Sequence, residues 1–128
     1  FSFSGLKTAV IYKIRQLKKD KQWWKDTKNN LAWEIQEAIS DVLVEKTVQA
    51  AKKYRVKSIL LGGGVTANQV LREKLKEKGR PFNLFIPPIK LCVDNAAIIG
   101  AAAYFIGHAT PWQEIKVKPN LKIRDYPY

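Results

Sequence analysis

Residues 57–68 read Lys-Ser-Ile-Leu-Leu-Gly-Gly-Gly-Val-Thr-Ala-Asn, and this stretch decides the fold class. The short apolar run Lys57–Leu61 is followed at once by glycines, which predicts a buried β-strand and a sharp turn. The next residues predict a helix over Ala67–Lys78, with Gly79 as its C-terminal cap. Asn83–Ile86 is a second apolar run, stopped by two prolines, and it predicts a second strand. A strand–helix–strand unit of this length closes a right-handed crossover onto a parallel sheet.

Three further helices are predicted around this unit from the spacing of their apolar residues. The first follows a cap at Ser4, and the second runs from a cap at Asn30 to about Tyr54. A last helix is predicted over Ala96–Gly107, after a cap at Asp94. Two strands are too few to cover these helices, so we expect strands from outside these residues, or from a second copy, to complete the sheet. The sequence therefore predicts an α/β fold that is mostly helical with a small parallel sheet.

The composition is that of one soluble domain. Apolar residues make up 46% and charged residues 27%, and no apolar run approaches the ~18 residues that a membrane span needs. Cys92 is the only cysteine, which excludes an internal disulfide and fits a reducing compartment. With His108 as the one histidine, a self-contained zinc site is excluded too. The sequence has no methionine, so we expect Phe1 to be a processed or internal start. After Pro111 we expect an irregular tail with one short strand around residues 115–117.

The chain is strongly basic. The formal net charge is +12, and residues 1–30 alone carry eight basic and two acidic side chains. A charge of this size attracts polyanions, nucleic acid first and acidic membranes second. The other interpretation is a set of solvated helix faces. Trp23 and Trp24 lie among these lysines, where they would either stack on RNA bases or pack against another part of the protein.

The glycine turn, Gly62–Gly64, is the first candidate site. The backbone there is open to a ligand because no side chain intervenes, and the free N–H groups of the following helix favour a phosphate. Ligands of open α/β sheets sit at the carboxyl ends of the strands, where this turn lies. Asn68, near the start of the predicted helix, is expected to project into this mouth, with an amide that can both donate and accept hydrogen bonds. The turn lacks the Gly-Lys-Ser/Thr ending of a P-loop and matches only a weak dinucleotide pattern, so a tight turn without a ligand is the alternative.

Leu91–Ala97 is the second candidate site, because it follows the second strand and opens on the same edge of the sheet. Asp94 is a metal ligand, a general base or simply the helix cap. Cys92 has no base nearby and is expected to be a small buried residue. His108 is expected at the helix C-terminus, so a Cys/His nucleophile pair is not predicted.

Three strings occur in order: Phe-Ser-Phe-Ser-Gly-Leu-Lys-Thr at 1–8, Gly-Gly-Gly-Val-Thr-Ala-Asn at 62–68 with Leu71 and Arg72 after it, and Cys-Val-Asp-Asn-Ala-Ala at 92–97. Together they resemble the C-terminal part of the TsaD-like family of tRNA threonylcarbamoyladenosine synthesis transferases, formerly described as O-sialoglycoprotein endopeptidases or glycoproteases. The resemblance covers nearly the whole chain and is weakest at residues 18–30 and after Pro111.

The resemblance implies an actin/hexokinase-like ATPase fold (ribonuclease H-like) of two lobes, with residues 1–128 as a C-terminal lobe fragment and the N-terminal lobe absent. It implies an acyltransferase that moves threonylcarbamoyl from its adenylate to the adenosine beside the anticodon of certain tRNAs in the cytoplasm. The implied partners are tRNA, threonylcarbamoyl-adenylate or ATP, and the other proteins of the tRNA threonylcarbamoylation complex, with no membrane. The fragment alone is expected to be inactive, because the first lobe is missing. It is also expected to self-associate, because its sheet has exposed edges.

By matching motifs, the resemblance implies that Asn68 binds the adenylate or nucleotide and that Gly63 and Gly64 line its path. Asp94 would be the carboxylate ligand of a divalent metal, iron in this family, with one metal per full-length subunit. The family's other metal ligands are a His-x-x-x-His pair that these residues lack, and His108 matches neither. The resemblance carries over no catalytic residue.

Two other functions stay open. The first is a non-catalytic assembly partner of the same fold, and the retention of Asn68 and Asp94 argues against it. The second is a phosphotransferase of the same superfamily, such as a sugar or acetate kinase, and the string at residues 1–8 argues against that. One departure from the family, Val93 in place of the common threonine, leaves the neighbouring Asp94 in place.

Overall fold

The computed structural model describes residues 2–107, 109–117 and 119–120. The chain divides into two compact units, residues 1–94 and residues 95–128. His108, expected at a helix C-terminus, lies outside the described residues. In the part of the chain that is described, no helix has the length and apolar character needed to cross a bilayer.

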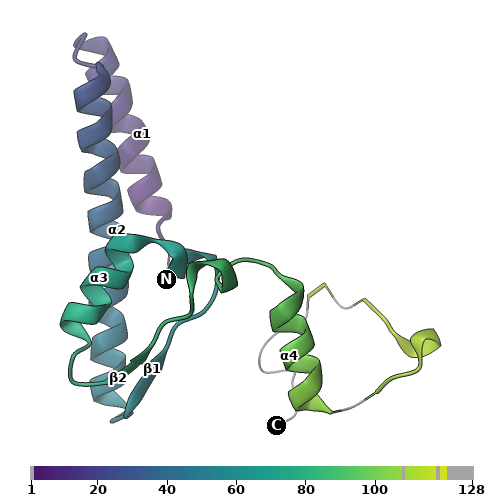
Figure 1. Cartoon of the computed structure of the whole chain (residues 1–128). Coiled ribbons are helices and arrows are strands. Elements are labelled where there is room, and N and C mark those ends of the chain that lie inside the picture. Colours follow the sequence, from purple (N-terminus) through teal and green to yellow (C-terminus); the bar gives the residue numbers. More distant parts are fainter. Residues whose placement is uncertain (1, 108, 118, 121–128) are drawn as a thin grey trace. The chain divides into compact units, whose positions relative to one another are not determined.

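Two long helices, α1 (Ser4–Lys19) and α2 (Lys25–Lys53), run antiparallel and side by side in the first unit (Figure 1). Each is followed by a residue with left-handed backbone, Lys21 after α1 (φ 53°) and Arg55 after α2 (φ 52°). A residue of this conformation turns the chain sharply away from a helix end. α2 therefore folds back along α1, and the chain then reverses again to enter the sheet.

The structure corrects the predicted N-terminal caps of α1 and α2. Ser4 is the first residue of α1, and the cap position belongs to Phe3. α2 begins well before the predicted cap at Asn30, because the polar residues ahead of it extend the helix without adding an apolar period. Asp26 lies in this first turn, where its negative charge interacts favourably with the helix dipole. Gly79 ends the next helix as predicted.

The strands β1 (Ser58–Leu60) and β2 (Asn83–Phe85) form a parallel pair, with Ile59 opposite Leu84. The parallel sheet and its crossover helix are thus confirmed, although each strand is slightly shorter than predicted. Ile59 is buried, whereas Leu60 and Phe85, which are paired in register, are 75% and 58% exposed. Because successive side chains of a strand point to opposite faces, the sheet has one covered face and one open apolar face.

The crossover helix α3 (Gln69–Lys78) packs against α2 over a small apolar core. The buried members of this core are Val44, Leu71 and Leu75, and Leu43, Val48, Leu61 and Leu84 pack around them. At its edge, Lys74 of α3 forms ion pairs with Glu37 (2.6 Å) and Asp41 (2.7 Å) of α2. The hydrogen bond from Lys74 lowers the pKa of Asp41 below its ordinary value. These contacts fix the middle of α3 against the middle of α2.

The second unit contains α4 (Ala96–Ile106) and a short 3-10 turn, η3 (Trp112–Glu114). Asn95 caps α4, because its Oδ1 accepts the N–H of Ile98 at 3.0 Å. The prediction of Asp94 as the cap is therefore wrong: the cap is the residue immediately before the helix, and α4 begins one position later than a cap at Asp94 requires. In the described part of this unit, residues 115–117 form no strand, which corrects that expectation as well.

Candidate functional site

The glycine turn leaves β1 and leads into a 3-10 turn, η1 (Gly64–Ala67), which the sequence did not predict. Gly63 has φ 85° and ψ 168°, a region of backbone conformation that is essentially restricted to glycine. The buried Thr66 closes the turn by donating both its hydroxyl and its N–H to the carbonyl oxygen of Gly63. A Cβ built at Gly62, Gly63 or Gly64 would meet nothing within 4 Å. The turn is thus internally fixed, and its backbone is open on the outside.

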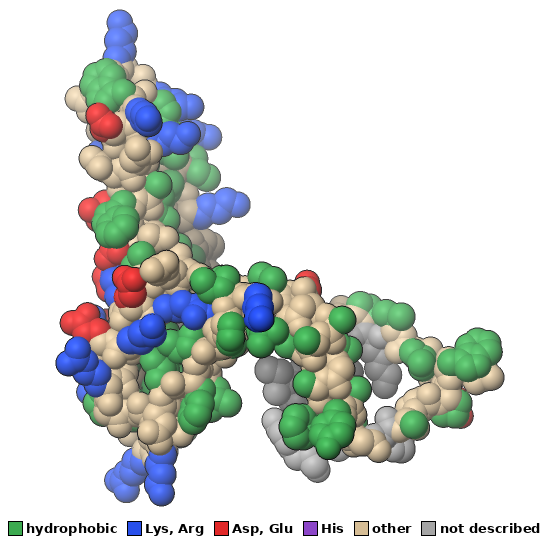
Figure 2. All heavy atoms as spheres, in the orientation of Figure 1, with side chains coloured by type: hydrophobic (Ala, Val, Ile, Leu, Met, Phe, Trp, Pro, Cys, Tyr) green, Lys and Arg blue, Asp and Glu red, His purple; other side chains and the backbone are tan. Residues whose placement is uncertain are grey.

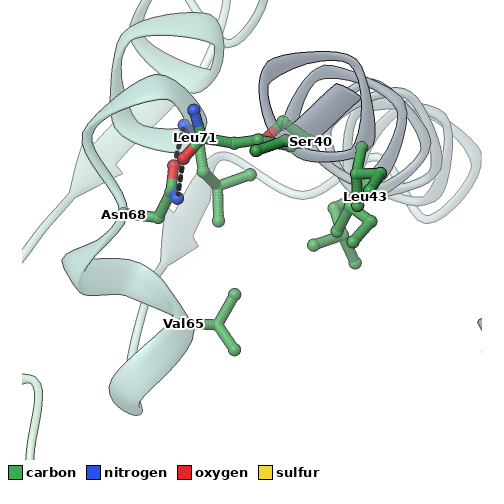
Figure 3. Close-up of a pocket in the computed structure, with 9 residues that line it drawn as sticks. Ser40, Leu43, Val65, Asn68 and Leu71 are labelled. Carbon is green, nitrogen blue, oxygen red and sulfur yellow. Dashed lines mark hydrogen bonds between the residues drawn. The ribbon is translucent and has the colours of Figure 1, made fainter. Parts of the chain in front are cut away.

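Asn68 is the N-cap of α3, which begins at Gln69, two residues later than predicted. Its Oδ1 accepts the N–H of Leu71 at 3.0 Å, and its Nδ2 donates to Oε1 of Gln36 in α2 at 2.8 Å (Figure 3). The amide is therefore held at both ends. One lone pair on the oxygen and one hydrogen on the nitrogen are left over, because an amide offers two of each.

A cavity of about 280 Å³ lies between α2 and the corner made by η1 and the start of α3. Nine residues line it: Ala32, Ile35, Gln36, Ile39, Ser40, Leu43, Val65, Asn68 and Leu71. Figure 3 shows side chains from both sides around this space, with Val65 facing the α2 wall. The cavity is close to the lower end of the size range of small-molecule sites, and its few polar groups among apolar walls are typical of them. The sequence motifs did not predict the α2 wall of this cavity, although its residues recur at helical spacing on one face of α2.

Arg72 connects the glycine-turn region to the segment that follows β2. Its Nε donates to the carbonyl oxygen of Thr66 at 2.5 Å, and its Nη2 donates to the carbonyl oxygen of Pro87 at 2.6 Å. The same Nη2 lies 3.1 Å from Sγ of Cys92, which is buried, as predicted. The two candidate segments therefore meet around one guanidinium, in agreement with the prediction that both open on the same edge of the sheet.

Asp94 lies two positions beyond Cys92 and is exposed. Among the described residues it has no hydrogen-bond or ion-pair partner, since the capping role belongs to Asn95. In the same part of the chain, no three His, Cys, Asp or Glu side chains come together in a way that could hold a metal ion. Asp94 is thus a single carboxylate, and the described residues do not form a metal site by themselves.

Basic side chains gather on the α1 side of the helical hairpin, and acidic side chains on the opposite side (Figure 2). Every basic residue of α1 is exposed: Lys7, Lys13, Arg15, Lys18 and Lys19. At the tip of the hairpin, Nζ of Lys18 lies 5.8 Å from the ring centroid of Trp23, and Trp24 is 61% exposed. We call this surface, residues 7–28 of the hairpin, the basic surface.

Comparison with known proteins identifies a family. The family model described as "TsaD: tRNA N6-adenosine threonylcarbamoyltransferase" matches residues 1–101. Curated proteins named tRNA N6-adenosine threonylcarbamoyltransferase are similar to nearly the whole chain. The protein of Thermosipho melanesiensis is 43% identical to this chain over 96% of this chain's length. The protein of Moorella thermoacetica is 49% identical over 82% of this chain, and that of Geobacillus thermodenitrificans is 47% identical over 88% of it.

The matched residues make up 37%, 31% and 32% of these three relatives, so the chain spans about a third of their length. The match is to their C-terminal portion. A family model that covers most of the chain and relatives with more than 40% identity agree with each other. The chain therefore belongs to the tRNA N6-adenosine threonylcarbamoyltransferase family.

Proposed function

We propose that this chain works as part of a protein of the relatives' length, here called the full-length protein, that transfers threonylcarbamoyl to tRNA. The group would move from its adenylate to the exocyclic amine of the adenosine beside the anticodon, with the enzyme in the cytoplasm. The family membership supports this proposal, and the fixed amide of Asn68 beside the cavity is the structural observation that carries it. The family also implies a two-lobed, actin/hexokinase-like fold for the full-length protein, of which the parallel sheet and its helices would form one part.

In this proposal, Asn68, Gly63 and Gly64 bind the adenylate. The open backbone of the turn allows close approach of a phosphate, and the spare donor and acceptor of Asn68 recognise a polar edge of the nucleotide. The incoming amine attacks the carbamoyl carbon, the bond from that carbon to the phosphate oxygen breaks, and AMP leaves while the amine loses a proton. Holding the adenylate still in one orientation is the contribution of these residues to the rate.

We further propose that Asp94 is one ligand of a divalent metal, iron, in the full-length protein. An exposed carboxylate that neither caps a helix nor pairs with a described cation is available for such a role. In this proposal the remaining ligands come from outside the described residues, because these hold no group of three side chains that could bind a metal ion. A carboxylate suits iron when imidazoles complete the set.

Replacing Asn68 by serine in the full-length protein is expected to weaken adenylate binding about tenfold, the loss of roughly one hydrogen bond. Serine is as good a cap as asparagine, so the thermal midpoint should stay close to that of the wild type. Isothermal titration with a non-hydrolysable adenylate analogue measures the affinity. Gln36→Ala is the matched control, because it removes the same bond between Gln36 and Asn68 but keeps the Asn68 amide. Wild-type affinity in Asn68→Ser would remove Asn68 from the site.

Binding of tRNA by the basic surface is expected to be weak, poorly sequence-specific and sensitive to salt. If about four phosphates are contacted, log affinity should fall with log salt at a slope of roughly −3 to −4. Fluorescence anisotropy with labelled tRNA at several salt concentrations measures the slope. Lys18→Gln should reduce its magnitude by about 1, whereas Lys52→Gln, at the far end of α2, should leave it unchanged. A flat salt dependence would mean that these lysines are only solvated.

The isolated chain is expected to self-associate through the open face of its sheet. Leu60 and Phe85 give this face an exposed apolar surface, and a two-stranded sheet keeps unpaired edges. Analytical ultracentrifugation at tens of micromolar should show species larger than the monomer, and Leu60→Lys should reduce them. A single monomeric species of the wild-type chain contradicts this expectation.

A further inference from the structure

We propose that Arg72 is a positioning residue that sets the adenylate-binding corner and the Asp94 carboxylate in one fixed arrangement. The inference rests on the proposed function, since it takes these two places as parts of one active site. Arg72 itself is not assigned to the substrate. Its guanidinium acts through three acceptors: the carbonyl oxygens of Thr66 and Pro87 and the sulfur of Cys92.

The three acceptors come from both sides of the site. Thr66 belongs to η1, whose turn is closed onto Gly63, so the bond to Thr66 holds the glycine turn. Pro87 and Cys92 lie on either side of the 3-10 turn η2 (Ile89–Leu91), just before Asp94. Within this first unit, one side chain therefore ties together two segments that are about twenty residues apart in the sequence.

The anchor of this bridge is the same helix start that carries Asn68. The backbone N–H of Arg72 donates to the carbonyl oxygen of Asn68 at 3.2 Å, so the two residues share the first turn of α3. The Asn68 side chain is set by Leu71 and Gln36, and the bridge then fixes Cys92 relative to that turn. Asp94 follows two residues after Cys92, so the position of its backbone relative to α3 also depends on this contact. The distance between the adenylate and the carboxylate thus depends on Arg72 without any contact between Arg72 and either.

The chemistry of the bridge requires a guanidinium. Arginine presents five donors in a rigid planar fork, which lets one group reach acceptors that lie in different directions. Lysine offers a single nitrogen on a flexible stem and cannot span them. Thr66 and Cys92 are 5% and 3% exposed, so water cannot readily replace the missing donor. Loss of Arg72 should therefore release the segment before Asp94 locally, while the core of Val44, Leu71 and Leu75 remains.

The first test measures this local release through the Cys92 thiol. The full-length protein is pulsed with N-ethylmaleimide under native conditions, and labelling of the Cys92 peptide is followed by mass spectrometry. We expect Arg72→Gln to label at least about tenfold faster than the wild type, as a lost bond of roughly 1.4 kcal/mol implies. Arg72→Lys should label nearly as fast, because lysine cannot restore the bridge. Arg80→Gln, an exposed arginine just beyond α3, is the matched control and should not change the rate.

General loss of stability must be separated from local release. Leu75→Ala removes a core side chain without touching the bridge, and its thermal midpoint is compared with that of Arg72→Gln. The rate of Cys92 labelling is compared at temperatures that lie equally far below the thermal midpoint of each variant. If the two rates are equal, Arg72 is only a structural residue and the inference fails.

The second test is adenylate affinity of the same variants, measured by titration of the analogue. Arg72→Gln should weaken binding about tenfold, and Leu75→Ala should leave it near the wild-type value at a temperature where both are folded. Fast labelling of Cys92 with unchanged affinity would overturn the positioning role, although the bridge would stand. Failure of the wild-type protein to bind the analogue would instead overturn the proposed function, and the labelling rates would still report on the bridge.

Discussion

Replacing Asp94 by alanine in the full-length protein is expected to remove the bound iron and abolish threonylcarbamoyl transfer, with a thermal midpoint equal to that of the metal-free wild type. Asp94 is exposed and has no partner among the described residues, so its removal leaves no buried group unsatisfied. Loss of a direct ligand should weaken metal binding by more than ~100-fold, since removal of a supporting group alone reaches that size. Inductively coupled plasma mass spectrometry of the purified variant measures the metal content.

The neighbouring residue provides the control for this prediction. Asn95→Ala removes the cap of α4 and should lower stability by about 1 kcal/mol, while the metal content stays at the wild-type level. Asp94→Ala should therefore lose the metal and keep the stability of the metal-free wild type, whereas Asn95→Ala should keep the metal and lose stability. Full metal content in Asp94→Ala would show that Asp94 is not a ligand, and the site would then have to be assigned again.

The isolated chain of 128 residues is expected to show no transfer of threonylcarbamoyl to tRNA at all. Its described residues contribute one carboxylate and no cluster that could hold a metal. The purified chain is incubated with tRNA, threonylcarbamoyl-adenylate and iron or zinc, and the nucleosides are analysed by mass spectrometry.

The full-length protein under the same conditions is the positive control for this experiment. Adding the isolated chain to a full-length Asp94→Ala variant should not restore activity, because the missing ligand must lie in the same folded site. Turnover by the isolated chain above the no-protein background would contradict the expectation and would place the whole catalytic apparatus within these residues.

The sequence predicted the strand–turn–helix–strand unit well, because its signals are local. An apolar run that ends in glycines or prolines identifies β1 and β2 without any knowledge of the rest. The start of α2 could not be read in this way, since the polar residues 25–30 extend the helix but carry no apolar period. The cap of α4 was misplaced by one residue because Asp94 and Asn95 are equally good capping residues, and only the backbone conformation of Asn95 decides between them.

The candidate site was predicted in part. Asn68 and the glycine turn were found from their motif, but the partner of the Asn68 amide, Gln36, lies 32 residues away on a helix face with no distinctive pattern. Arg72 was part of the quoted motif, yet its role was not visible. Two of its three acceptors are backbone carbonyl oxygens, and every residue has one, so the sequence contains no signal for such contacts.

The cap of α4 also bears on how proteins of this kind diverge. Asn95 caps the helix and Asp94 does not, so if Asp94 is the metal ligand proposed above, selection for folding and selection for chemistry act on two neighbouring codons separately. A duplicated gene that loses the carboxylate would still encode the same helix start. On the proposed role of Asp94, such a copy would be folded but inactive, and neutral drift could reach it without an unfolded intermediate.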